Sequence, residues 1–212
     1  MVVSRGSKKT RIIGYNNLST SKGRTRWYAL PELHPSKIAM PELYSMRFLT
    51  FFSEVPFLAD HLFDVAYPTS QLDDKTLYLY LNSTIYLLML ELWSPRMGGG
   101  GGALHPRTIE FKTIPVPNLT LLKSALKNTA FGQRETKIYF EEVNERDRME
   151  LDGTVLQGMG FEKAYTKELF PRLYKEYVEL VQDRLIKAGK NISDTISAEL
   201  ELTENSEDED ND

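Results

Sequence analysis

A run of five glycines lies between an apolar segment and a proline-rich one: Gly98, Gly99, Gly100, Gly101 and Gly102. Because glycine has no side chain, such a loop can bring its backbone N–H groups close to another surface, where they bind anions. Arg96, His105 and Arg107 flank the run, and the two arginines are suited to phosphate oxygens or base edges. The stretch therefore fits a nucleic-acid contact. It fits a floppy surface loop equally well.

Other patterns that carry chemistry are missing from the sequence. The glycines lack the preceding strand and following helix of a dinucleotide loop, and no Gly-Lys-Ser or Gly-Lys-Thr follows them. There is no cysteine, the three histidines have no metal-ligand spacing, and no Gly-x-Ser-x-Gly occurs. Two acid-x-Lys triplets, at 73–75 and 135–137, are interpreted as solvated charge clusters. We predict no catalytic residue, no metal ligand and no cofactor bound by this chain.

Strands are predicted on both sides of a long helical segment. Short stretches rich in aromatic and β-branched residues are typical of strands, and they occur at 26–33, 37–43, 47–58, 61–68 and 108–117. In the last of these, Ile109, Phe111 and Thr113 are expected on one face. The residues between Asp74 and Trp93 recur at helical spacing, and Asn82 or Ser83 could cap or break that helix midway.

Two helical regions are predicted after Pro117. Residues 118–131 have helical spacing, with Asn118 or Thr120 as the cap. Residues 161–190 carry one apolar stripe, in which Pro171 marks a helix start or a kink. The stripe consists of Leu169, Leu173, Tyr177, Leu180, Val181 and Leu185. These elements predict an α+β fold, with a mixed α/β domain and a helical C-terminal extension.

Composition and charge place the chain among cytoplasmic proteins. Its 212 residues are 41% hydrophobic and 26% charged, which is ordinary for a chain with one sizeable core. The most apolar run, at 76–93, is interrupted by polar residues, so a buried helix is favoured over a membrane span. Residues 1–31 contain seven Lys or Arg and no acid, and residues 191–212 contain nine acids and no base. A basic front end suits a polyanion, although both ends also fit solvated tails.

Three blocks, in order, resemble the target-recognition part of adenine-specific DNA methyltransferases of restriction–modification systems, both TaqI-like and type I. The family pattern of Leu-Asn-Ser, a helix, a glycine-rich loop and a Pro-Val-Pro exit is matched by residues 81–119. "GRTRWYALPE" followed by "KIAMPEL" is similar to the opening of that region. "RDRMELDGTVLQGMGF" followed by "LYKEYVELVQDRLIKA" is similar to its helical end. The resemblance covers about residues 24–188.

The resemblance implies DNA recognition without the chemistry of methylation. The glycine-rich motif for S-adenosylmethionine and the Asn-Pro-Pro-Tyr type motif for the flipped adenine are both absent. We therefore expect double-stranded DNA and a catalytic methyltransferase domain or subunit as partners, with S-adenosylmethionine bound by the latter, and no membrane. The expected organisation is a flexible basic N-terminus (1–13), a target-recognition domain (14–118), a helical extension (119–190) and an acidic disordered tail (191–212).

Particular residues can be given an expected role. We expect Asn82 and Ser83 to cap a helix, and Trp27, Tyr28 and Phe111 to belong to the core. A protein-interaction module that docks through its helical extension, with vestigial DNA contact, remains the alternative. The candidate DNA contacts are Lys22, Arg24, Arg26, Arg96, Gly98, Gly99, Gly100, Gly101, Gly102, His105 and Arg107.

Overall fold

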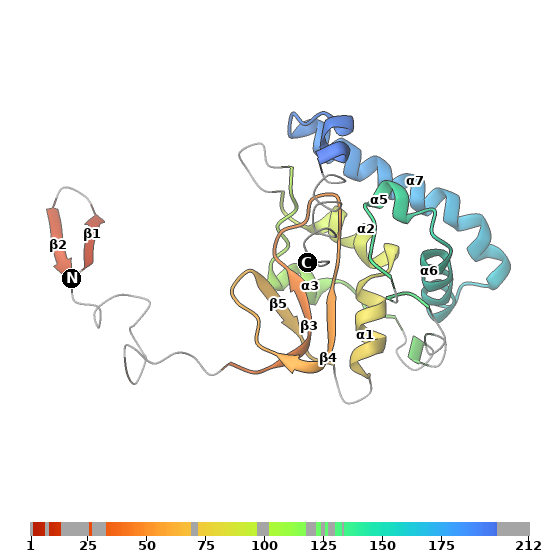
Figure 1. Ribbon diagram of the computed structural model, residues 1–212, viewed down its shortest axis with the longest axis horizontal. Coiled ribbons are helices and arrows are strands. Elements are labelled where there is room, and N and C mark those ends of the chain that lie inside the picture. Colours follow the sequence, from red (N-terminus) through yellow and green to blue (C-terminus); the bar gives the residue numbers. More distant parts are fainter. Residues whose placement is uncertain are drawn as a thin grey trace, which may run out of the picture. The chain divides into compact units, whose positions relative to one another are not determined.

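The computed structural model describes residues 2–6, 9–13, 26, 33–68, 72–96, 102–117, 122–123, 126, 130–132 and 134–198. The chain divides into two compact units, Met1–His34 and Pro35–Asp212. In the second unit a three-stranded antiparallel sheet packs with several helices, which is the predicted α+β class (Figure 1). Of the predicted elements, the strand at 26–33 and the caps Asn118 and Thr120 lie almost wholly outside the described residues.

The first unit contains a β-hairpin where a flexible segment was expected. Strand β1 (Val2–Gly6) pairs antiparallel with β2 (Lys9–Ile13), so that Val2 lies opposite Ile13. Both strands are rich in β-branched residues, which favour extended backbone. The strand was not predicted because the basic residues in 1–13 were interpreted as a flexible segment, and the β-branched residues among them were not considered.

The sheet of the second unit has the order β4-β3-β5. The central strand β3 (Ser36–Pro41) is the most buried, and it pairs antiparallel with β4 (Phe51–Phe57) and β5 (Phe63–Ala66). Between Ser36 and Ile38 the register shifts, and the Ser36 hydroxyl donates to the carbonyl of Ala66 at 2.7 Å. The strands predicted within 37–43, 47–58 and 61–68 are confirmed.

The predicted helix at 74–93 is two helices, broken at the expected dipeptide. Helix α1 (Asp74–Leu81) ends at Asn82, and α2 (Thr84–Trp93) begins after Ser83. The Ser83 hydroxyl accepts from the backbone N–H of Tyr86, as an N-cap does. The Asn82 side chain bonds both backbone groups of Thr50, at 3.1 and 3.2 Å, which ties the break to the chain just before β4. Asn82 therefore ends α1 and holds it to the chain before β4, and Ser83 caps α2.

The strand predicted at 108–117 is wrong, because a short helix begins there. Helix α3 (Thr108–Thr113) is preceded by Arg107, whose backbone N–H donates to the Glu110 carboxylate at 2.8 Å. A glutamate at the third helical position that reaches back in this way stabilises a helix start. The expected strand face does not exist: Ile109 is 63% exposed, while Phe111 packs partly buried against the core.

The C-terminal half is helical, as predicted. Helix α5 (Tyr139–Glu142) and α6 (Arg146–Gly158) precede the long α7 (Lys163–Lys187), and residues 192–198 form a further helical segment. Pro171 lies inside α7. The buried face of α7 includes Tyr177, Val181 and Leu185 from the predicted stripe, and also Tyr174 and Arg184.

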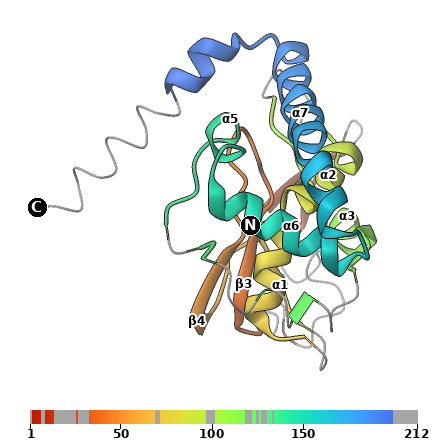
Figure 2. The ribbon, with the colours of Figure 1, turned by 90° about the vertical axis from the view of Figure 1, so that its right-hand side faces the viewer.

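A single hydrophobic core joins the sheet to all of the larger helices. Buried residues of β3, α1, α2, α6 and α7 belong to one cluster, so the helices after residue 118 pack on the same core as the sheet. Figures 1 and 2 both place α7 beside α2, and these helices are in contact. Ile196 packs against the same cluster, so the ordered chain extends past the expected start of the tail at residue 191. Residues 199–212 lie outside the described part.

Candidate nucleic-acid interface

The two ends of the glycine run are held together by backbone pairing. The N–H of His105 donates to the carbonyl of Pro95 at 2.9 Å, and Arg96 forms an antiparallel bridge with Leu104. Leu104 in turn exchanges two hydrogen bonds with Tyr44, at 2.8 and 3.1 Å. We call residues 94–96 and 102–107 the loop base. Gly98 to Gly101 lie outside the described residues, but their point of departure is fixed by this pairing.

Gly102 is turned toward the protein. It is buried, it has φ of +65°, and a Cβ placed there would lie 3.0 Å from the Cβ of Ala188. Only glycine adopts that φ without strain, and only the missing side chain admits the end of α7. We expected Gly102 to approach DNA. Its position instead gives it a packing role.

A buried arginine fastens the loop base to the rest of the fold. The Arg184 side chain is 1% exposed, and its Nε donates to Glu91 at 2.8 Å. Its other two nitrogens donate to the carbonyls of Gly102 and Ser45, the latter at 2.7 Å. A guanidinium with five donors can join three chain segments in this way. Because Glu91 neutralises the charge, the pair is tolerated in the core.

The exposed cations of the loop base differ in their pairing. Arg107 is 64% exposed and lies 3.0 Å from Glu110; a hydrogen bond from Arg107 is the main cause that lowers the pKa of that carboxyl. His105 Nε2 lies 3.6 Å from a Glu42 oxygen. Arg96 is exposed, and within the described residues it has no ion pair. Arg96 is therefore the cation most available to an anion.

An aromatic side chain that was not singled out in the sequence lies next to these cations along the chain. Trp93 is the last residue of α2 and is 50% exposed, three positions before Arg96. Exposed aromatic rings beside cations are surfaces on which bases stack. The signal in the sequence was its place at the end of a predicted helix, two positions before a proline and three before an arginine.

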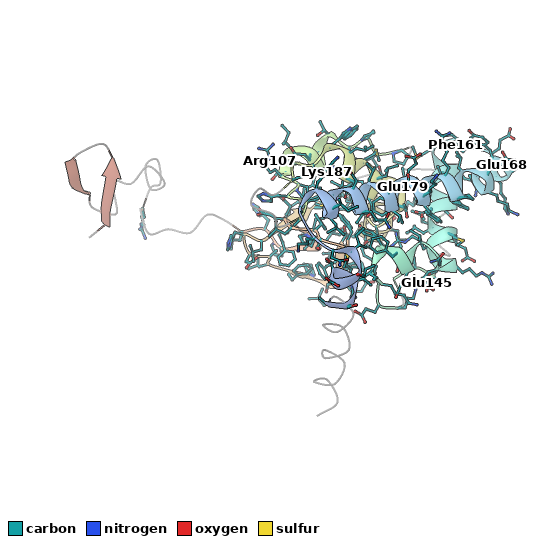
Figure 3. All side chains as sticks on the ribbon, turned by 90° about the horizontal axis from the view of Figure 1, so that it is seen from above. Arg107, Glu145, Phe161, Glu168, Glu179 and Lys187 are labelled. Carbon is teal, nitrogen blue, oxygen red and sulfur yellow. The ribbon has the colours of Figure 1, made fainter. Side chains whose placement is uncertain are left out.

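The remaining candidate contacts lie in the first unit or outside the described residues. Arg26 is exposed and belongs to the first unit, whereas Lys22, Arg24, Trp27 and Tyr28 lie outside the described residues. Figure 3 shows Arg107 toward one end of the second unit, and Phe161 and Glu168 at the opposite end. Within the described part of the second unit, the candidate contacts that have a side chain are therefore Arg96, His105 and Arg107.

A second buried arginine holds the break between α1 and α2. Arg148 is 1% exposed; its Nε donates to Glu142 at 3.1 Å, and its Nη1 donates to the carbonyl of Asn82. Its guanidinium lies 4.4 Å from the ring centroid of Phe131. Arg134 adds a bidentate contact to Glu142 at 2.9 Å. Burial alone would raise the pKa of Glu142, but the hydrogen bonds from Arg134 and the charge of Arg148 lower it.

A buried carboxylate completes the support of α2. Asp152 accepts from the backbone N–H of Thr84 at 2.8 Å and from the Tyr174 hydroxyl at 3.0 Å. Its pKa is raised, and the largest cause is burial. Asp152 thus ties the first turn of α2 to both α6 and α7. Buried polar groups of this kind, whose partners are remote in sequence, were missed by the sequence reading.

Neither a metal centre nor a membrane span is found in the described part of the chain. Its His, Asp and Glu side chains form no group that could hold a metal ion. Each of its helices is too short or too polar to cross a bilayer. No protein-family model, curated protein or solved structure matches the chain.

Proposed function

We propose that this chain is the DNA-recognition module of a restriction–modification adenine methyltransferase, and that it positions duplex DNA for a separate catalytic domain or subunit. One observation carries the proposal: segments from the different sequence blocks that carry the resemblance are in contact around the loop base and α2. Their contacts are Arg148 with Asn82, Asp152 with Thr84, and Arg184 with Gly102. This connectivity supports reading the blocks as one recognition unit.

The loop base supplies the DNA contacts in this proposal. Arg96, without an ion pair among the described residues, binds a phosphate or a guanine edge. Arg107, whose side chain is 64% exposed, exchanges its contact with Glu110 for a phosphate, while Glu110 keeps its hydrogen bond from the backbone N–H of Arg107. Trp93 offers a stacking surface. Arg184 acts on these groups only by holding the loop base in place.

The methyl transfer itself belongs to the partner. Extrusion of an adenine requires a pocket beside the cofactor, and the motifs for both are absent from this sequence. We therefore assign no catalytic residue to the chain and leave S-adenosylmethionine to the catalytic domain or subunit. In this proposal the chain acts on duplex DNA in the cytoplasm.

Duplex binding and cofactor binding are tested separately. Fluorescence anisotropy with a labelled duplex at low salt is expected to show saturable binding in the non-specific range, about 10⁻⁴–10⁻⁶ M. Calorimetric titration with S-adenosylmethionine is expected to show no binding. Absence of duplex binding, with or without the catalytic subunit, would reject the recognition function. Micromolar binding of the cofactor at one site would reject the division of labour.

A second function, docking of a partner protein, is favoured by the far end of the unit. A groove of about 750 Å³, lined in part by Met149, runs between α6 and α7, and the side chains of Met149, Phe161 and Tyr165 are 36–48% exposed. Replacing Phe161 and Tyr165 by serine should weaken binding of the catalytic subunit in a pull-down while leaving duplex affinity unchanged. If the double variant binds both as wild type does, this surface has no docking role.

A further inference from the structure

A small pocket opens between the sheet, α1 and α3, on the outer side of the core. Its volume is about 310 Å³, which is at the lower limit for ligand pockets. Leu77 and Leu81 of α1 form one apolar wall, and Phe111 of α3 and Val65 of β5 contribute others. The ring of Tyr86 also lines it. Apolar walls on several sides suit a flat ring better than a flexible chain.

A few polar groups interrupt this apolar lining. The partly buried Asp64 contributes a carboxylate, and the Thr108 hydroxyl donates to its Oδ1 at 2.9 Å. The other oxygen, Oδ2, has no hydrogen bond or ion pair within the described residues. Lys112, which is exposed, adds a cation on the helix that carries Thr108. An apolar slot with a few convergent polar groups is the usual form of a small-molecule site.

The chemistry of these groups defines a class of ligand. A carboxylate oxygen accepts hydrogen bonds only, so the ligand must present an N–H or amino group to Asp64. The apolar walls require an aromatic body of one or two rings. Lys112 can reach an anionic substituent such as a phosphate. A nucleobase with an exocyclic amino group, free or within a nucleic acid, meets all three conditions.

We propose that this pocket binds one amino-bearing nitrogen heterocycle of nucleobase size, with Asp64 accepting from the amino group. Thr108 positions the carboxylate through its hydrogen bond. The inference does not depend on DNA recognition, because a free nucleoside would satisfy it. If the heterocycle comes from DNA, the inference deepens the proposed function, since Thr108 directly follows Arg107 of the loop base.

Two nucleosides that differ in a single group test the role of Asp64. Adenosine and purine riboside share rings and sugar, but only adenosine has the exocyclic amino group. Saturation-transfer NMR and titration calorimetry are expected to show adenosine binding tenfold or more tightly, because a hydrogen bond to a charged group contributes about 1.5–3 kcal/mol. Equal affinities for the two nucleosides, or no saturable adenosine binding at several millimolar, would overturn the proposal.

Two carboxylate variants provide the matched control. Asp64→Asn keeps an oxygen that can accept from Thr108, so the fold should persist; its melting temperature checks this. The preference for adenosine should fall to less than twofold. Glu54→Gln removes a charge from an 82% exposed side chain on β4, outside the pocket, and should leave the preference unchanged. Equal effects of the two variants would show that the pocket does not carry the preference.

The source of the heterocycle is distinguished with a duplex that carries one 2-aminopurine. A rise in its fluorescence on protein binding, removed by Asp64→Asn, identifies a base unstacked from DNA. Adenosine binding without that rise identifies a free nucleoside or nucleotide. Both outcomes support the pocket. Failure of duplex binding alone would reject the recognition function and leave the adenosine result standing.

Discussion

The tight contact between Gly102 and α7 predicts a large loss of stability on a small substitution. In Gly102→Ala, the left-handed φ of +65° costs about 1–2 kcal/mol for a residue with a Cβ. The new Cβ also lies 3.0 Å from the Cβ of Ala188, and overpacking of this kind costs about 1–3 kcal/mol. The free energy of unfolding should therefore fall by roughly 2–5 kcal/mol.

A second glycine isolates the contact from the backbone strain. Gly189 has φ of +73°, but a Cβ there meets nothing within 4 Å. Gly189→Ala should therefore cost only the strain, about 1–2 kcal/mol. In a chain of this length each kcal/mol lowers the melting temperature by roughly 2–4 °C. Urea denaturation of the two variants at neutral pH measures the difference directly.

A double-mutant cycle tests whether Ala188 is the neighbour responsible. Ala188→Gly removes the Cβ that Gly102→Ala would meet, so the double variant should be more stable than the sum of the single changes predicts. Additive losses, or equal losses in Gly102→Ala and Gly189→Ala, would refute the packing role of Gly102 against Ala188.

Three further predictions concern the support of the fold. Arg184→Met should destabilise by about 3–5 kcal/mol because it leaves Glu91 buried and unpaired, and adding Glu91→Leu should recover much of the loss in urea denaturation. The pKa of the Glu142 carboxyl is lower in the folded protein than in the unfolded chain, where it is about 4.3. The ionised carboxylate therefore stabilises the fold above about pH 4.3, and this contribution is lost as the pH falls through the folded pKa. Arg134→Met should therefore flatten the fall in stability between pH 7 and pH 3; an unchanged pH profile would contradict this. Ile196→Ala should lower the melting temperature, whereas an unchanged value would show that residues 192–198 add nothing.

The elements could be predicted where the signal is local. The break at Asn82 and Ser83 was visible because small polar residues interrupt an apolar helical run, and both side chains do cap helices. The strands at 37–43, 47–58 and 61–68 were visible from short aromatic segments bounded by proline. At 108–117 the same rule failed. Three alternating residues are too few to specify a strand, and Glu110 reaches back to start a helix instead.

The supports of the candidate site could not be predicted, since their partners are remote. Arg184 lies three positions after Val181 and seven after Tyr177, so it is on the same face of α7 as the apolar stripe. This spacing was a sign in the sequence that Arg184 is buried. Its partner Glu91, however, is 93 residues away. Asp152 likewise bonds a backbone group 68 residues away. Local periodicity describes one helix at a time and gives no pairing between helices.

The central claim is that DNA is bound at the loop base, and the salt dependence of duplex binding tests it most directly. Arg96→Ala and Arg107→Ala remove cations at the loop base. Arg146→Ala is the control, because it removes a 93% exposed cation at the first residue of α6. Figure 3 shows the preceding residue, Glu145, far from Arg107. Fluorescence anisotropy with one labelled duplex, at several salt concentrations, gives the affinity and the salt slope of each variant.

A lost phosphate contact should weaken duplex binding and reduce the slope of log K against log salt by about one. A lost contact to guanine should instead cost roughly 1–3 kcal/mol and relax sequence preference, with a smaller change in slope. We expect Arg96→Ala and Arg107→Ala each to show one of these patterns, and Arg146→Ala to match wild type in both affinity and slope. If the three variants lose affinity equally, or if only Arg146→Ala does, the loop base is not the DNA-binding surface.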